Sequence, residues 1–342
     1  MKKLLVMMLV LILAAAAAGF LVLTRVRQPY QAWTGLEQFV DIPPGAGTRV
    51  IGDKLVAAGV MPDALTYRAG LWLTGDARRL KAGEYRFDHP MSPVDVIGKI
   101  ARGDVYVINV TFPEGLTVAE MAAIFEKHAL GPADEFVQAA RDALPIRALD
   151  PAATDLEGYL FPDTYPLSRH TSAAALVHLM AARFANVLTP AIRQAAAARG
   201  LTIRQLVTMA SIVEKETGRA EERPIVAAVY GNRVRIGMPL QCDPTLIFAL
   251  ARAGKYTGNL RHDDLAFDSP YNTYRYRGLP PGPIASPGLA SIEAALNPSA
   301  DPYLYFVSRN DGSHAFARTL DEHNRNVQKW QVEYFREKRG RK

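Results

Sequence analysis

The chain has 342 residues, of which 49% are hydrophobic and 22% are charged, so it is long enough for two or more domains with cores of their own. Its formal net charge is +6, but residues 1–27 and residues 336–342 each carry +4, which leaves −2 for the rest. A nucleic-acid-binding protein needs a basic face on its folded part, so this distribution argues against that class. The single cysteine, Cys242, excludes an internal disulfide, and no cysteine and histidine spacing of a zinc module is present.

The first segment is an apolar run from Leu4 to Leu23 without a charge. Twenty residues at about 1.5 Å each span a hydrocarbon core of about 30 Å. A signal peptide is the alternative, because small residues fill Ala14 to Ala18. Apolar residues continue from Phe20 to Leu23, which favours an uncleaved transmembrane anchor over residues 1–24. Basic residues flank the run on both sides, so charge alone leaves its orientation open.

After a polar linker over residues 25–37, residues 38–103 predict a small α/β domain. Turn residues and apolar spacing divide it into alternating strands and helices. The expected elements are a strand at residues 39–42, a helix from Thr48, a helix over Leu65–Leu73, a strand within Leu80–Phe87 and a helix over Ser92–Ala101.

Residues 104–335 predict a larger mixed α+β domain, followed by a basic tail at residues 336–342. A strand is expected over Val105–Phe112, and a helix should follow it, because Thr117 and Glu120 have capping-box spacing. The chain is alanine-rich and predicted helical from Thr171. The stretch Gly278–Pro283 is too rich in proline and glycine for a helix or a central strand, so we expect an ordered loop. Tyr303–Val307 predicts a further strand.

A helix beginning after Thr202 holds the most informative carboxylates. Thr202 and Gln205 form a predicted capping box, and Gly218 lies where a C-terminal stop belongs. The helix is apolar on most of its faces, which predicts a buried helix. At about 100° per residue, Glu214 and Glu216 point about 160° apart, so they cannot serve one site together.

Glu216 is the stronger candidate for chemistry. It follows apolar residues on its own face and lies at the negative end of the helix dipole, and both features should raise its pKa towards that of a general acid. Arg219 could oppose this by pairing with it. A solvated carboxylate at a helix end is the alternative interpretation.

Two loops carry residue types that suit sugars. Gln241 and Asp243 place an amide and a carboxylate beside a proline, and Tyr271, Asn272 and Tyr274 add aromatic faces and an amide. Sugar rings stack on aromatic side chains while their hydroxyls bond to amides and carboxylates. Such loop residues equally often bond their own backbone, which leaves a structural role open for each.

Other candidate groups have mainly structural interpretations. Glu157 is a possible second acid and Asp163 a possible cap, and we favour structural roles for both. The seven histidines show no metal-binding spacing, and the nucleophile-elbow and phosphate-loop motifs are absent from the sequence, so we expect neither metal nor cofactor. His314 and His323 are expected to pack or to hydrogen-bond rather than to act as bases.

Several segments together resemble the YceG-like endolytic murein transglycosylases over roughly residues 1–335. Their order and spacing both match the family. They are Ala210–Thr217, Asn232–Arg233, Leu240–Thr245, Tyr271–Tyr274, Gly278–Ile284, Pro302–Val307 and Glu322–Asn324.

The resemblance implies a single-pass protein of the bacterial inner membrane, with its catalytic part in the periplasm and a LysM-like domain at residues 38–103. It implies peptidoglycan glycan strands as substrate, peptidoglycan synthases as candidate partners and no nucleic acid. Glu216 matches the family's catalytic glutamate. Cys242 departs from the family pattern, where hydroxyl residues are common. We expect this change to affect substrate binding more than the chemical step.

The implied reaction cleaves the bond between N-acetylmuramic acid and N-acetylglucosamine within a strand and leaves a 1,6-anhydro end. Glu216 would act first as acid and then as base, with the nucleophile supplied by the substrate. Gln241, Asp243, Tyr271, Asn272 and Tyr274 are expected to line the cleft. A non-catalytic wall-binding scaffold and a hydrolysing muramidase are the alternatives.

Overall fold

The computed structural model describes the backbone of residues 2–340, so residues 341–342 of the predicted basic tail lie outside the described residues. The chain divides into two compact units. The N-terminal unit comprises residues 1–108 with 166–168, and the C-terminal unit comprises residues 109–165 with 169–342.

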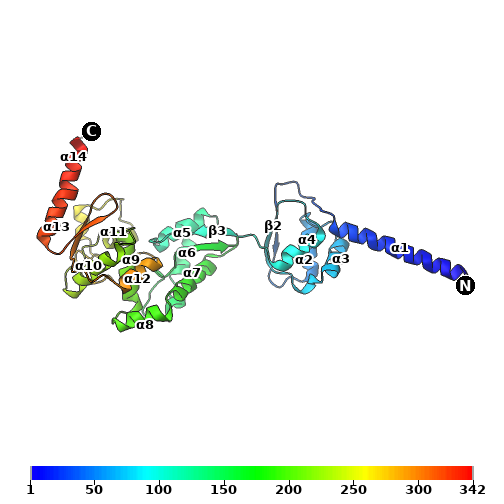
Figure 1. The fold of residues 1–342 in the computed structure, drawn as a ribbon, viewed down its shortest axis with the longest axis horizontal. Helices are drawn as coiled ribbons and strands as arrows, with labels where there is room; N and C mark the ends of the chain where they lie inside the picture. The colour runs from blue at the N-terminus through cyan, green and yellow to red at the C-terminus, as the bar shows by residue number, and fades with distance from the viewer. Residues whose placement is uncertain (1, 341–342) are drawn as a thin grey trace. The chain divides into compact units, whose positions relative to one another are not determined.

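The N-terminal unit begins with the predicted apolar helix and continues as a small α/β fold, in agreement with the sequence (Figure 1). Its two strands pair antiparallel, with Val40 opposite Tyr85 and Ile42 opposite Gly83. Its elements are α1 (Lys2–Arg27), β1 (Gln38–Ile42), α2 (Thr48–Ala57), α3 (Ala64–Thr74), the 3-10 turn η1 (Asp76–Arg78), β2 (Gly83–Phe87) and α4 (Pro93–Arg102).

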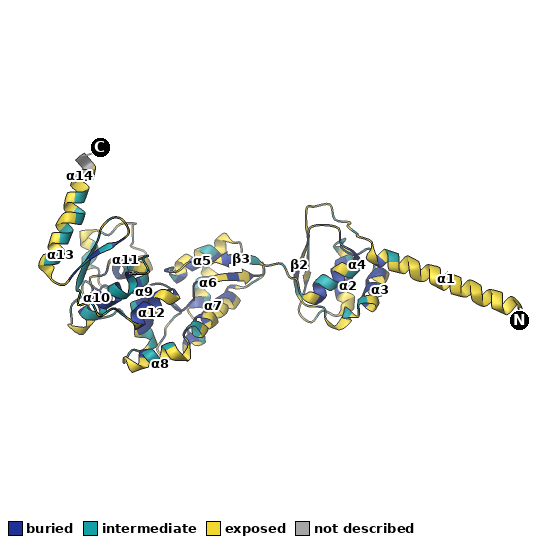
Figure 2. Cartoon of the chain, in the orientation of Figure 1, coloured by how far each residue is buried: buried dark blue, intermediate teal, exposed yellow. Residues whose placement is uncertain are grey.

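Helix α1 is long and apolar enough to cross a membrane, and its surface is exposed along almost its whole length (Figure 2). Among the described residues, one further pair of helices, α7 (Ala173–Val187) and α8 (Pro190–Ala198), passes the same test only together, with a bend of 64°. Because α7 buries Leu176, Met180 and other apolar residues in the C-terminal unit, core packing accounts for its composition.

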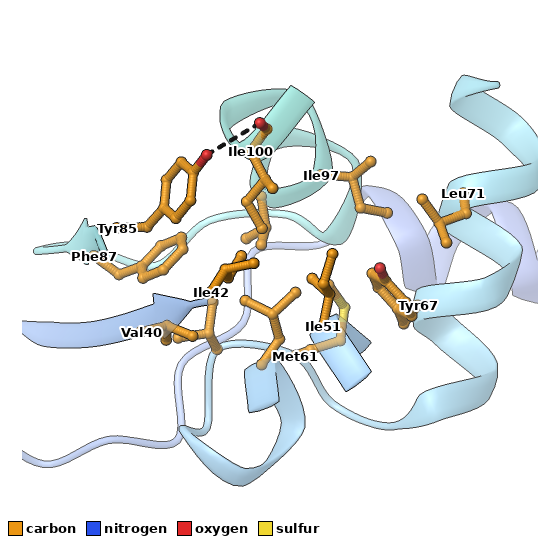
Figure 3. Packing of buried hydrophobic residues seen from close by; sticks show 13 residues of the cluster. Val40, Ile42, Ile51, Met61, Tyr67, Leu71, Tyr85, Phe87, Ile97 and Ile100 are labelled. Atoms are coloured by element: carbon orange, nitrogen blue, oxygen red, sulfur yellow. Dashed lines mark hydrogen bonds between the residues drawn. The ribbon is translucent and has the colours of Figure 1, made fainter. Parts of the chain in front are cut away.

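The core of the N-terminal unit lies between the β1–β2 pair and helices α2 to α4 (Figure 3). Tyr85 reaches across this core, and its hydroxyl donates to the Ile100 carbonyl at 3.2 Å. Gly52 lets α2 and α3 approach closely, because a Cβ there would lie 2.4 Å from the Tyr67 ring. The LysM-like assignment of this unit stays a prediction.

The C-terminal unit is mostly helical, with short two-stranded sheets. Its elements are β3 (Ile108–Thr111), α5 (Val118–Lys127), α6 (Ala133–Ala140), η2 (Leu144–Ile146), β4 (Thr164–Leu167), α7, α8, α9 (Ile203–Glu216), α10 (Arg223–Arg235), α11 (Asp243–Arg252), η3 (His262–Ala266), α12 (Leu289–Leu296), β5 (Tyr305–Ser308), β6 (His314–Ala317), α13 (Leu320–Val327), the π-helical η4 (Gln328–Glu333) and α14 (Tyr334–Gly340). Strand β3 pairs with β4, and β5 pairs antiparallel with β6.

Local signals in the sequence placed most of these elements correctly. Both predicted capping boxes, at Thr117 and Thr202, are formed. The two predicted strands are present but shifted, since β3 begins only at Ile108 and β5 begins at Tyr305. The stretch 278–283 contains neither helix nor strand, as expected.

Helix α9 is the buried helix that the sequence predicts. It lies against α12, and seven of the 14 residues of α9 and five of the eight residues of α12 are buried (Figure 2). It ends just before Gly218, where the sequence places the stop, but the glycine is not left-handed. The helix ends on an extended Thr217, whose hydroxyl donates to Glu222 at 3.2 Å and accepts from the Arg219 amide at 3.1 Å, so no left-handed glycine is needed.

Candidate active site

Glu216 is the last residue of α9, and its side chain turns into the C-terminal unit. Its Oε1 accepts hydrogen bonds from the Tyr230 hydroxyl at 2.6 Å and from the Cys242 thiol at 3.1 Å. Arg219 does not pair with it, because that guanidinium bonds to Glu221 at 3.4 Å and to the Asp311 carbonyl at 3.0 Å. Both of these hydrogen bonds to the carboxyl group therefore come from neutral donors.

This environment raises the pKa of Glu216. Burial is the largest cause, and the nearby Asp243 carboxylate acts in the same direction. The hydrogen bonds from Tyr230 and Cys242 and the proximity of His314 act against it by stabilising the anion. A raised pKa keeps the carboxyl group protonated closer to neutral pH, as a general acid requires.

Glu214 faces a different part of the unit, as its angular separation from Glu216 predicts. Its Oε2 accepts from the Gly288 amide at 3.0 Å, and its Oε1 lies 3.6 Å from the Arg223 guanidinium, with both side chains nearly buried. These contacts join the end of α9 to α10 and to the start of α12. Glu214 thus has a structural role.

The turn before α11 carries two of the predicted binding residues. Gln241 has a φ of 50°, a left-handed conformation that costs a non-glycine residue about 1 kcal/mol or more. The turn is held by Thr273, whose carbonyl accepts from the Gln241 amide at 3.1 Å and whose hydroxyl accepts from the Cys242 amide at 3.0 Å. A strained backbone held in this way is typical of functional sites.

A cavity of about 360 Å³ opens in front of Glu216. It brings together four of the predicted site residues, from α9, the α11 turn and the loop after η3. Its lining consists of Glu216, Tyr230, Arg233, Gln241, Asp243, Tyr274, Tyr305, Phe306, Leu320 and His323. The Tyr274 hydroxyl donates to Asp243, which fixes one tyrosine edge and one carboxylate at the cavity wall.

Two predicted cleft residues do not line this cavity. Asn272 is fully buried, its amide donates to the carbonyls of Leu265 and Phe267, and its oxygen accepts from the Tyr274 amide. We expected Asn272 to contact substrate, but its side-chain amide and oxygen both bond to backbone groups of its own loop. Asn272 therefore shapes this loop. Tyr271 packs on Phe248, with ring centroids 5.0 Å apart.

Comparison with known proteins identifies the family of this chain. The YceG-like family matches residues 40–329. The chain belongs to the YceG-like family. A Bacillus subtilis protein named endolytic murein transglycosylase is 32% identical over 85% of this chain and 84% of its own length. A Streptococcus pneumoniae protein of the same name is 31% identical over 84% of this chain and 57% of its own length.

A solved structure of a YceG-like protein supports the same assignment. The crystal structure of a putative yceG-like protein from Listeria monocytogenes matches with a TM-score of 0.58 and 30% identity, over 85% of this chain and 99% of that one. The two proteins therefore share their architecture over most of this chain.

Sequence reasoning missed Tyr230, the closest donor to Glu216 in this YceG-like protein. Tyr230 lies on α10, fourteen positions after Glu216, and only the packing of α9 against α10 brings the two side chains together. Sequence reasoning also missed that the Cys242 thiol contacts the Glu216 carboxyl directly, at 3.1 Å.

Arg233 and His323 are further residues whose place in the site the sequence did not reveal. The buried Arg233 guanidinium donates to the carbonyls of Leu304 and Leu240, which joins β5 to the α11 turn. His323 stacks on Tyr305, with centroids 5.2 Å apart, and its buried Nδ1 has no hydrogen-bond partner among the described residues. His314 instead contacts Glu222 at 2.6 Å, which agrees with its expected hydrogen-bonding role.

Glu157 lies in a different cavity of about 460 Å³, together with Phe248 and Arg252. Its carboxyl group accepts from the Val118 amide at 3.1 Å, so it caps the first turn of α5. Burial raises its pKa to about 8 despite this bond. The cap supports the structural role that the sequence favoured. Among the described residues, no cluster of three or more histidine, cysteine or acidic side chains could hold a metal ion.

Proposed function

We propose that this YceG-like protein is a membrane-anchored endolytic murein transglycosylase with Glu216 as its catalytic residue. The observation that carries the proposal is a carboxyl group of raised pKa, held by two neutral donors at the wall of a cavity that also holds an amide, a carboxylate and aromatic side chains. The names of its relatives support the same activity.

In the first step, protonated Glu216 donates its proton to the glycosidic oxygen between N-acetylmuramic acid and N-acetylglucosamine. The bond from that oxygen to C1 of the muramyl residue breaks, and N-acetylglucosamine leaves with a free hydroxyl. The Glu216 carboxylate then takes the proton from the muramyl C6 hydroxyl, whose oxygen bonds to C1 and closes the 1,6-anhydro ring. Glu216 ends protonated, so the proton balance closes with no water consumed.

One carboxyl group is sufficient for this reaction, because the substrate supplies the nucleophile. Glycosidases that use water or an enzyme nucleophile normally need a second carboxylate. The other carboxylate of this cavity, Asp243, already accepts a hydrogen bond from Tyr274. We assign Asp243, Gln241 and Tyr274 to binding sugar hydroxyls and ring faces.

Tyr271 and Asn272 have a supporting role in this proposal. Asn272 shapes the loop that presents Tyr274, through its bond to the Tyr274 amide. Tyr271 packs behind that loop on Phe248. Both would affect activity through the position of Tyr274 rather than through contact with the glycan.

The proposal extends to the location of the protein. Helix α1 anchors it in the inner membrane, and the remainder works in the periplasm beside the wall. The N-terminal unit, residues 38–103 without the anchor, is proposed as a LysM-like glycan-binding domain. Peptidoglycan synthases are the partners that would supply nascent strands.

Replacement of Glu216 by Gln tests the chemistry. The variant keeps an acceptor for Tyr230 and Cys242, so it should fold, but it has no proton to donate and should lose about 10²- to 10⁴-fold in rate. Mass spectrometry of digested purified murein measures the 1,6-anhydro ends. Glu221→Gln is the matched control, since its carboxylate is exposed and paired only with Arg219.

The chain ends that are released separate the candidate functions. The proposal is supported if the wild type and Glu221→Gln release anhydro ends and Glu216→Gln does not. Full activity of Glu216→Gln would show that Glu216 is not the catalytic residue. Reducing ends from the wild type would indicate a hydrolysing muramidase, and a wild type that makes no new ends would indicate a non-catalytic scaffold.

A further inference from the structure

An exposed apolar stripe runs along α3 in the N-terminal unit. Trp72 is 85% exposed and Leu65 is 70% exposed, whereas the opposite side of the helix buries Tyr67 and Leu71 in the core. Leu65, Arg68 and Trp72 follow one another at spacings of three and four, so they share one face of the helix. A large indole left in water is unusual in a folded domain and marks an interaction surface.

The same helix is fixed to the end of the apolar helix α1. Arg25 of α1 donates to Asp63 at 2.7 Å and to the Thr66 hydroxyl at 3.1 Å, and Val26 is buried in the unit. Figure 1 shows α3 beside the point where α1 joins the unit. The last turn of α1 and the first turn of α3 therefore form one rigid joint.

This joint determines the depth of α3 relative to a bilayer. The apolar run of α1 ends at Leu23, so Arg25 lies at headgroup level if α1 spans the membrane. A groove of about 300 Å³ lies between the two helices, with Val22 on one side and Leu65 and Ala69 on the other. The exposed stripe of α3 is thus continuous with the lipid-facing surface of α1.

The chemistry of the stripe suits the boundary between headgroups and acyl chains. Tryptophan is enriched at this depth because its ring is apolar while its N–H can hydrogen-bond. Arg68 is exposed on the same face of the helix and can contact anionic headgroups. A soluble protein partner would need no such continuity with α1.

We propose that the Leu65, Arg68 and Trp72 face of α3 docks on the membrane surface that surrounds α1. The proposal rests on α1 being the membrane anchor of the proposed function. Docking fixes the N-terminal unit against the bilayer instead of leaving it to rotate on a single helix.

The test uses the full chain reconstituted in vesicles of phosphatidylethanolamine and phosphatidylglycerol, with lipids brominated in their acyl chains as quenchers of tryptophan fluorescence. The wild type should show quenching that depends on the brominated lipid, and Trp72→Phe should lose most of it. Trp330→Phe removes a tryptophan of η4 in the C-terminal unit and is the matched control, for which the quenching should persist.

A second pair of variants leaves all tryptophans in place. Leu65→Gln should reduce the quenching of Trp72, whereas Val50→Gln, at an exposed position of α2, should leave it unchanged. Equal quenching in the wild type and Trp72→Phe would overturn the docking surface. Resistance to alkaline extraction reports separately on α1: a chain that is extracted disproves the anchor, and an anchored chain with an unquenched Trp72 disproves only the docking.

Discussion

At the scale of single residues, the protonation of Glu216 depends on opposing effects of its surroundings on its pKa. Burial raises its pKa, and hydrogen bonds from Tyr230 and Cys242 lower it. Neither donor can ionise readily, because burial holds the pKa of both well above the ordinary range. In the proposed mechanism, Tyr230 and Cys242 are therefore positioning residues that adjust the pKa of Glu216 without exchanging its proton.

Substitution of the two donors should move the pH profile in opposite directions. Tyr230→Phe removes a hydrogen bond to the anion, so the pKa of Glu216 should rise and the alkaline limb of kcat/KM should shift to higher pH. Cys242→Ser replaces a weak thiol donor with a stronger hydroxyl, so the limb should shift to lower pH. The rate of anhydro-end release, measured from pH 5 to 9, checks both.

The two substitutions should change the maximal rate less than they change the pH at which the rate falls. We expect maximal rates within about tenfold of the wild type, equivalent to about 1.4 kcal/mol in the barrier. Parallel shifts of both variants, or no shift in either, would contradict the tuning role. Unchanged unfolding temperatures would show that the cavity wall is intact.

At the scale of elements, α9 is held at both ends by ionic contacts that do not involve Glu216. Near its start, Arg204 donates to Asp150 at 2.9 Å and 3.1 Å, and near its end Glu214 contacts Arg223. Helix α5 is similarly held at its start, by its capping box and by Glu157. These fixed helix ends explain how a mostly helical unit holds a precise cavity.

The burial of Glu157, which raises its pKa, predicts a pH-dependent stability. The pKa of Glu157 rises from about 4.5 in the unfolded chain to about 8 in the folded one, so only the folded state holds this proton between these values. The free energy of unfolding should therefore fall as pH rises from about 4.5 to 8. Glu157→Gln carries no titrating proton and should show a flatter dependence.

Urea unfolding at pH 5 and pH 8 measures this effect. The loss of stability between the two values should be smaller for Glu157→Gln than for the wild type. Glu135→Gln, at an exposed position of α6, is the control and should follow the wild type. Identical pH dependence in all three proteins would show that Glu157 does not titrate in this range.

At the scale of the whole molecule, α1 packs on the N-terminal unit and is also its proposed membrane anchor. A chain that begins at Thr24 should stay in solution without detergent and keep its fold, because it retains Arg25 and Val26. A chain that begins at Gln28 loses the buried Val26 and the Arg25 contacts with Asp63. Its N-terminal unit should be less stable by about 1 to 2 kcal/mol, measured by urea unfolding.

Equal stability of the two truncated chains would contradict a joint between α1 and α3. A chain from Thr24 that still required detergent would indicate that apolar surface outside α1 also needs lipid, and the Leu65 and Trp72 face of α3 would be the first to examine. The comparison therefore separates the anchoring role of α1 from its packing role.

The sequence by itself determined the features that depend on local chemistry. The apolar run of α1, the capping boxes at Thr117 and Thr202 and the buried nature of α9 follow from spacing and side-chain type over a few turns. The opposite directions of Glu214 and Glu216 follow from helix geometry alone. Each of these features depends on residues within one helix, so the sequence alone predicts it.

Only the tertiary structure decided what surrounds Glu216. Tyr230 reaches it because α10 packs on α9, and the Cys242 thiol reaches it because Thr273 holds a strained turn at Gln241. Asn272 was expected to contact substrate, but its side-chain amide donates to backbone carbonyls of its own loop. Contacts between residues far apart in the chain depend on how whole elements pack, and no local pattern in the sequence records that packing.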